Sequence, residues 1–106
     1  MILVRTEFQC KPGRVQEMID NFKSMAPMMK EQRVIKRTTL MTDLSGNFDT
    51  AVVESEVESI DAYFAMLQAA FADPELQADQ AASGNSLYQT GQRNFYKIEA
   101  TYDIEA

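Results

Sequence analysis

The chain has 106 residues, of which 45% are hydrophobic and 25% charged, a composition typical of one soluble globular domain with a single core. Its net charge of -6 and its lack of a basic block disfavour nucleic acid and anionic membranes as partners. The first apolar run ends at Arg5, far short of a signal peptide or membrane span, and one cysteine permits no disulfide within the chain. We therefore expect a cytoplasmic protein.

Histidine and tryptophan are both absent, which narrows the available chemistry. The chain has no imidazole base, no Ser–His or Cys–His nucleophile pair and no histidine metal ligand. We expect neither a bound metal nor an organic cofactor. Cys10 is a poor candidate nucleophile, because no histidine can activate it.

Residues 2–9 alternate as a strand does, with Ile2, Val4, Thr6 and Phe8 on the face that we expect to meet the core. The opposite face carries charged residues and is either wet or part of a polar interface. Pro12-Gly13 then ends the alternation.

A helix is predicted from Arg14 to about Met25 or Met29, and its methionine-rich stripe is typical either of core packing or of an adaptable pocket wall. Proline removes a backbone donor and disfavours helical geometry in the preceding residue. We therefore expect a kink or a short second helical piece at Pro27.

Residues 34–43 and 48–57 predict two strands joined by a turn over 44–47, which together make a hairpin. Ser59 is a good N-cap for an amphipathic helix with apolar residues at Ile60, Tyr63, Phe64, Leu67 and Phe71. A short alanine-rich helix over 74–82 should follow it.

A turn is expected around Gly91, before a last strand over 93–102. In this strand Tyr96, Ile98, Ala100 and Tyr102 share one face, and we assign Phe95, Lys97 and Glu99 to the other, open face of the sheet.

This order of elements predicts an α+β fold, the ferredoxin-like βαββαβ sandwich, with an antiparallel sheet in the order 4-1-3-2 and both helices on one face. On the open face we expect Arg5 and Glu7 to meet Lys97 and Glu99 across the pairing of the first and last strands. The mixture of apolar and charged residues there favours a homodimer formed through this face.

Three stretches resemble the dimeric α+β barrel superfamily, in particular the antibiotic-biosynthesis-monooxygenase-like and NIPSNAP-like proteins. They are residues 8–14, with Lys11-Pro12-Gly13; residues 46–54 together with 59–63; and residues 91–98. The resemblance spans most of the chain and implies a homodimer with a pocket between the helices and the sheet of each subunit.

The resemblance also implies two kinds of activity. Some members resemble cofactor-free oxygenases of quinol-like aromatic substrates. Others resemble haem-degrading enzymes, a branch that this chain does not fit because it lacks histidine and tryptophan. No catalytic residue is carried over from the family.

Tyr63, Arg93 and Tyr96 are the candidate substrate-binding residues. A phenol binds a phenolate or quinone and stacks on aromatic ligands, and an arginine neutralises an enolate or carboxylate. Alternatively, Tyr63 and Tyr96 are core residues, and Arg93 belongs to a surface or interface ion pair. The same two interpretations, anion binding or an ion pair, apply to Arg37. The acidic residues of 54–61 are not spaced as the ligands of a cation-binding loop are, so we expect them to form a solvated face.

Two functions remain open. One is a small homodimeric oxygenase that oxidises an aromatic or quinol-like molecule without a cofactor. The other is a non-catalytic dimer of the same fold that binds a small hydrophobic molecule or a protein. An RNA-binding ferredoxin-like domain is disfavoured by the charge and by the lack of the aromatic motif in its central strands.

Overall fold

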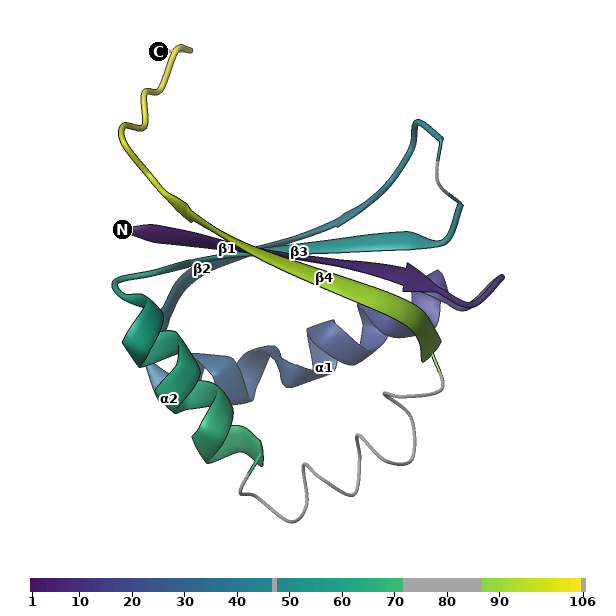
Figure 1. The fold of residues 1–106 in the computed structure, drawn as a ribbon, viewed down its shortest axis with the longest axis horizontal. Coiled ribbons are helices and arrows are strands. Elements are labelled where there is room, and N and C mark those ends of the chain that lie inside the picture. Colours follow the sequence, from purple (N-terminus) through teal and green to yellow (C-terminus); the bar gives the residue numbers. More distant parts are fainter. Residues whose placement is uncertain (47, 72–86, 106) are drawn as a thin grey trace.

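The computed structural model describes residues 1–46, 48–71 and 87–105. Its elements are β1 (Ile2–Cys10), α1 (Val15–Gln32), β2 (Ile35–Thr42), β3 (Thr50–Val57), α2 (Ile60–Phe71) and β4 (Tyr88–Lys97). The strands form an antiparallel sheet in the order β2-β3-β1-β4, and both helices cover one of its faces (Figure 1). This confirms the ferredoxin-like α+β fold and the predicted strand order. The short helix predicted over 74–82 lies outside the described residues.

Strand β1 lies at the centre of the sheet, between β3 and β4. Val4 and Thr6 on its helix-facing side are 1% and 8% exposed, as the alternation of apolar residues predicts. Arg5 lies on the open face, where it pairs with Glu54 of β3 at 2.9 Å. No helix within the described ranges is long and apolar enough to cross a membrane.

Helix α1 continues through Pro27 to Gln32, so the prediction of an end at Met25 or Met29 is wrong. Proline inside a helix costs about 3 kcal/mol, because a backbone hydrogen bond is lost. Met29, two residues after Pro27, lies among the side chains between α1 and the sheet, and this packing offsets the cost. The helix ends where Arg33 adopts a left-handed backbone with φ of 59° and its N–H donates to the Lys30 carbonyl.

The hairpin of β2 and β3 is confirmed, but β3 begins at Thr50 rather than at Phe48. Phe48 is 88% exposed, and Asp49 has a φ of 58°, which a strand does not permit. The Asp49 carbonyl accepts a hydrogen bond from the Cys10 N–H, and its carboxylate accepts one from the Gly13 N–H. These bonds join the hairpin loop to the turn before α1 and hold Asp49 out of the strand.

Strand β4 differs most from prediction, since it begins at Tyr88, ends at Lys97 and has no turn at Gly91. Gly91 pairs with Phe8 of β1, and a Cβ at this position would lie 3.4 Å from the Phe8 ring. Glycine therefore leaves room for Phe8 within a continuous strand.

The two faces of β4 are also opposite to those predicted. Phe95 pairs with Val4 and packs in the core, whereas Tyr96 pairs with Leu3 on the open face. Opposite residues in an antiparallel pair point to the same side. The expected meeting of Arg5 and Glu7 with Lys97 and Glu99 therefore does not occur: Arg5 lies opposite Asn94, and Glu7 lies opposite Gln92.

The side chains between helices and sheet form two clusters. One surrounds Cys10, Met18, Ile19, Ala51 and Leu87, beneath the first half of α1. The other surrounds Val4, Val57 and Tyr63, beneath α2. The space where these two clusters meet is incompletely filled.

Candidate functional site

A cavity of about 270 Å³ lies between the helices and the sheet, where the two core clusters meet. Its wall combines thioether and aromatic side chains with a few polar groups. Four of the seven methionines of the chain line it: Met18, Met25, Met29 and Met66. Methionine is flexible and polarisable, so this wall adapts to the shape of an apolar ligand.

Arg93 is the one cation among the described residues that line the cavity. It lies on β4 opposite Thr6, on the helix-facing side of the sheet, and its Nε donates to Thr6 Oγ1 at 3.2 Å. This bond uses one of the five guanidinium donors. No carboxylate in the described part of the chain lies within 4.0 Å of its nitrogens.

Tyr63 of α2 lies beside Arg93, with its ring centroid 5.5 Å from the guanidinium carbon. This distance is within the range of a cation–π contact. Tyr63 is 7% exposed, and its ring contacts that of Phe95 edge-on at 6.0 Å between centroids. An element on each side of the cavity therefore fixes the guanidinium: Thr6 from the sheet and Tyr63 from the helix layer.

Aromatic side chains form the other end of the cavity. Phe8 contacts Phe22 at 5.6 Å and Tyr88 at 5.0 Å between ring centroids. The remaining polar residues of the wall, besides the tyrosines and Arg93, are Thr6, Asn21 and Ser55. Ser55 is already engaged, since its Oγ lies 3.1 Å from Thr38 Oγ1. The described wall thus offers hydroxyls, one amide and one cation, and no carboxylate.

The structure brings together only two of the three predicted site residues. Tyr63 and Arg93 line the cavity, whereas Tyr96 lies on the opposite face of the sheet and is 46% exposed. Its hydroxyl accepts a hydrogen bond from Asn94 Nδ2 at 3.1 Å. The expectation that Tyr96 points between the layers is wrong, because strand alternation there places Phe95 inward.

The other charged candidates form ion pairs at the surface. Arg37 pairs with Glu56 at 3.8 Å, and Lys36 pairs with Glu58 at 3.4 Å. With Glu54 bound to Arg5, the acidic residues at 54, 56 and 58 each have a cationic partner. Within the described ranges no group of three acidic or cysteine side chains is placed to hold a metal ion.

Cys10 lies at the end of β1 and is 1% exposed. Burial, followed by the nearby charge of Asp49, raises the pKa of its thiol, and a hydrogen bond with the backbone of Ala51 opposes this only in part. A buried thiol whose pKa is raised is a weak nucleophile.

Several residues of the cavity wall are not predicted as site residues from the sequence. Thr6 is the clearest example, although the sequence does distinguish it. It is the one polar residue on the otherwise apolar face of the first strand. Phe8, Phe22 and Tyr88 resemble ordinary core residues in any pattern analysis. Their role in the cavity depends on how the two clusters meet.

The chain matches no model of a known protein family and no curated protein. Solved structures do match its fold. A NIPSNAP domain protein from Burkholderia xenovorans has a TM-score of 0.77 at 16% identity, over 97% of this chain and 99% of that one. SnoaB from Streptomyces nogalater, a cofactor-independent oxygenase, has a TM-score of 0.71 at 19% identity, over 94% of each chain.

A third match, from Deinococcus radiodurans, is assigned to the antibiotic biosynthesis monooxygenases, with a TM-score of 0.71 at 12% identity over the full length of both chains. These similarities confirm that the chain has the fold shared by NIPSNAP domain and antibiotic-biosynthesis-monooxygenase-like proteins. At such identities they show the fold alone.

Proposed function

We propose that the cavity binds an electron-rich aromatic or quinol-like molecule as its anion, and that the protein oxidises this molecule with dioxygen without a cofactor. The observation that carries the proposal is the position of Arg93, held between Thr6 and Tyr63 at a largely apolar cavity. A cation in such surroundings stabilises an anion more strongly than it does in water. The volume of about 270 Å³ suits a small ligand.

The chemistry needs little from the protein beyond this environment. Ionisation of a phenol or enol gives an anion that donates one electron to dioxygen, and the two radicals combine to a peroxide. Loss of water then leaves a new carbonyl, so a methylene and one dioxygen become a carbonyl and one water. The substrate is the only reductant, and Arg93 assists by lowering the pKa of the bound hydroxyl.

The fold comparison supports this proposal, since SnoaB is a cofactor-independent oxygenase with the same fold. We propose in addition a homodimer formed through the open face of the sheet. Leu3 and the half-exposed Tyr96 supply apolar surface there, beside the partly exposed Arg5–Glu54 ion pair. Mixed surfaces of this kind are common in dimer interfaces.

The test uses 2-naphthol, whose absorbance reports its ionisation. Bound to the wild-type protein, naphthol should ionise at a lower pH than in water, because the guanidinium stabilises the naphtholate. Arg93→Gln should abolish most of this shift, and about 1 to 3 kcal/mol of charge-assisted bonding corresponds to roughly one to two pH units. Arg37→Gln is the matched control, since Arg37 lies outside this cavity. A shift that survives Arg93→Gln would contradict the proposal.

A binding protein without turnover is the second candidate, and one observation favours it: the described cavity wall contains no carboxylate to accept the proton of the substrate. Oxygen consumption with anthrone, whose enol ionises and whose methylene can become a carbonyl, distinguishes the two. Oxygen consumption that exceeds the spontaneous rate, and that is lost in Arg93→Gln, supports the oxygenase. Binding with only the spontaneous rate supports the binding protein.

A further inference from the structure

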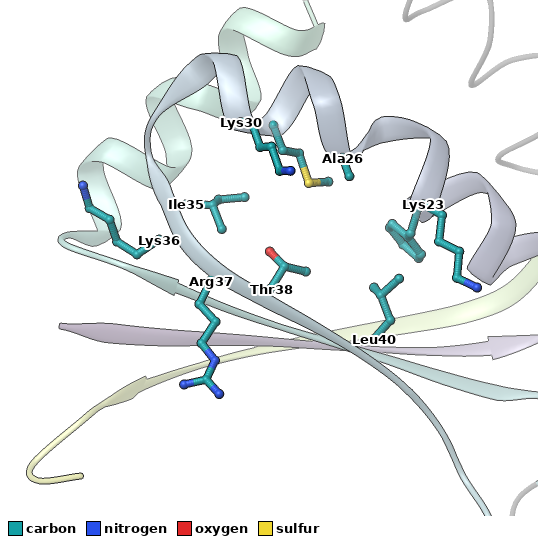
Figure 2. A pocket seen from close by; sticks show the side chains of 10 residues that line it. Lys23, Ala26, Lys30, Ile35, Lys36, Arg37, Thr38 and Leu40 are labelled. Carbon is teal, nitrogen blue, oxygen red and sulfur yellow. The ribbon is translucent and has the colours of Figure 1, made fainter.

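The two long sides of α1 face different hollows. A hollow of about 330 Å³ between α1 and β2 is lined by residues on one side of the helix, among them Ala26 and Lys30 (Figure 2). The cavity between the layers is lined from the other side by Met18, Asn21 and Met25, none of which lines that hollow. These three residues are spaced three and four apart, so they form one stripe along the helix.

The rest of the cavity wall shows which elements this stripe faces. The wall includes Tyr63 and Met66 of α2 together with Tyr88 and Arg93 of β4, and none of these four lines the hollow beside β2. The stripe is therefore on the side of α1 that faces α2 and β4. Asn21 thus brings an amide from the helix layer to the same cavity to which the sheet brings a guanidinium.

The carboxamide of Asn21 is the one amide in the described cavity wall, and it has no hydrogen-bond partner among the described residues. The Ser24 hydroxyl donates to the backbone carbonyl of Asn21 at 2.7 Å, not to its side chain. By contrast, Gln16 on the exposed side of the same helix donates to Asp20 at 3.0 Å. Asparagine is also a poorer helix former than leucine. Packing and helix stability therefore favour an apolar residue between the two methionines, and an amide there indicates another role.

We propose that Asn21 determines which aromatic molecules the cavity prefers, because its carboxamide forms a hydrogen bond with a second oxygen substituent of the bound molecule. This role rests on the proposed function, since the first oxygen is the anion beside Arg93. A carboxamide both donates and accepts hydrogen bonds, so it binds a hydroxyl or a carbonyl. The preferred ligand is therefore an aromatic molecule with two oxygen substituents rather than a simple phenol.

The positions of the two polar groups restrict where the second oxygen lies. Arg93 extends from the sheet and Asn21 from the helix layer, so the two side chains reach the ligand from different layers. Oxygens on adjacent carbons of one ring point to the same side and would both lie beside the guanidinium. The site therefore favours a fused aromatic system that carries its two oxygens on separate rings, with thioether and aromatic side chains around it.

Fluorescence titrations without dioxygen test this role, because binding is then measured with no turnover. The ligands are 2-naphthol and its four derivatives with a second hydroxyl on the other ring. The wild type should bind at least one of these diols about three- to tenfold more tightly than 2-naphthol, as one additional neutral hydrogen bond provides. Asn21→Leu has nearly the same side-chain volume, so it should bind 2-naphthol as before and lose the preference. Gln16→Leu is the matched control, since it removes an amide from the exposed side of α1 and should keep the preference.

The outcomes separate this role from the proposed function. A wild type that prefers none of the diols, or a preference that survives Asn21→Leu, would overturn the role of Asn21 and leave the binding of 2-naphthol intact. Absence of binding by 2-naphthol and all the diols would overturn both.

Urea unfolding verifies that the Asn21→Leu variant is folded. Its unfolding midpoint should rise, because leucine is the better helix former and adds apolar contact beside Met18 and Met25. A lowered midpoint would show that Asn21 stabilises the fold, and would overturn its assignment as a specificity-determining residue.

Discussion

Arg93 differs from the other arginines of the sheet in what surrounds it. Arg5 and Arg37 each face a carboxylate, Glu54 and Glu56. Arg93 instead binds a hydroxyl and lies against an aromatic ring, at 3.2 Å from Thr6 Oγ1 and 5.5 Å from the Tyr63 ring. Within the described residues its charge is oriented but not neutralised, which is the property that an anion-binding group needs.

Cys10 leads to a prediction at the scale of a single residue. Because burial raises its pKa above the ordinary value of 9.0, the protonated thiol stabilises the fold. This contribution is fully present below the pKa of the unfolded state and is lost as pH rises through the raised pKa of the folded state. The free energy of unfolding should therefore fall more steeply with alkaline pH in the wild type than in Cys10→Ala.

Urea unfolding at pH values below and above 9.0 measures this difference, with a slope of at most about 1.4 kcal/mol per pH unit from one proton. The Ala variant is the control for tyrosine and lysine ionisation, which both proteins share. Parallel pH dependences in the two proteins would show that the thiol is not perturbed.

At the scale of the elements, the N-terminus of α2 depends on one side chain. The Ser59 hydroxyl accepts a hydrogen bond from the Ala62 N–H at 3.1 Å, as an N-cap does. Ser59→Ala should lower the free energy of unfolding by about 1 kcal/mol, and Ser59→Asp should retain most of it. Chemical denaturation measures both variants. Equal losses in the two would mean that the cap bond contributes little.

The elements and their order could be predicted from local patterns, and the two largest errors, in α1 and β4, have physical causes. Pro27 predicts the end of a helix, but contacts made after it, such as those of Met29, continue α1. In β4 the helix-facing side carries Gly91 and Arg93 beside Phe95, so it does not resemble a core face. The alternation of Ile98, Ala100 and Tyr102 continued the Tyr96 set and suggested the wrong side, although these residues follow the strand.

The difficulty of deciding which face of β4 is buried also limits prediction of the site. Tyr63 and Arg93 could be selected as an aromatic and a cation at suitable places, and the register of β1 and β4 brings Arg93 opposite Thr6. Tyr96 could not be excluded without knowing which face of β4 is buried. The cavity itself is invisible in the sequence, because its lining residues are those of an ordinary core.

At the scale of the whole molecule, the account depends on the cavity between the helices and the sheet. Its wall is largely apolar and carries one oriented cation, Arg93, which fits a small aromatic anion. A second hollow, between α1 and β2, shares Phe22, Met29 and Ile35 with this wall (Figure 2). Two of the four cations around it, Lys36 and Arg37, already pair with Glu58 and Glu56.

The central claim is that an aromatic anion binds between the helices and the sheet. The methionines allow the position of the bound anion to be located. Of the seven, Met18, Met25, Met29 and Met66 line the cavity, whereas Met1, Met28 and Met41 do not. In NMR spectra of protein labelled at the methionine methyl groups, 2-naphthol added at alkaline pH should shift the four cavity methyls through its ring current and leave the other three nearly unchanged. Shifts confined to Met1, Met28 and Met41, or no shifts at saturating naphthol, would contradict the account.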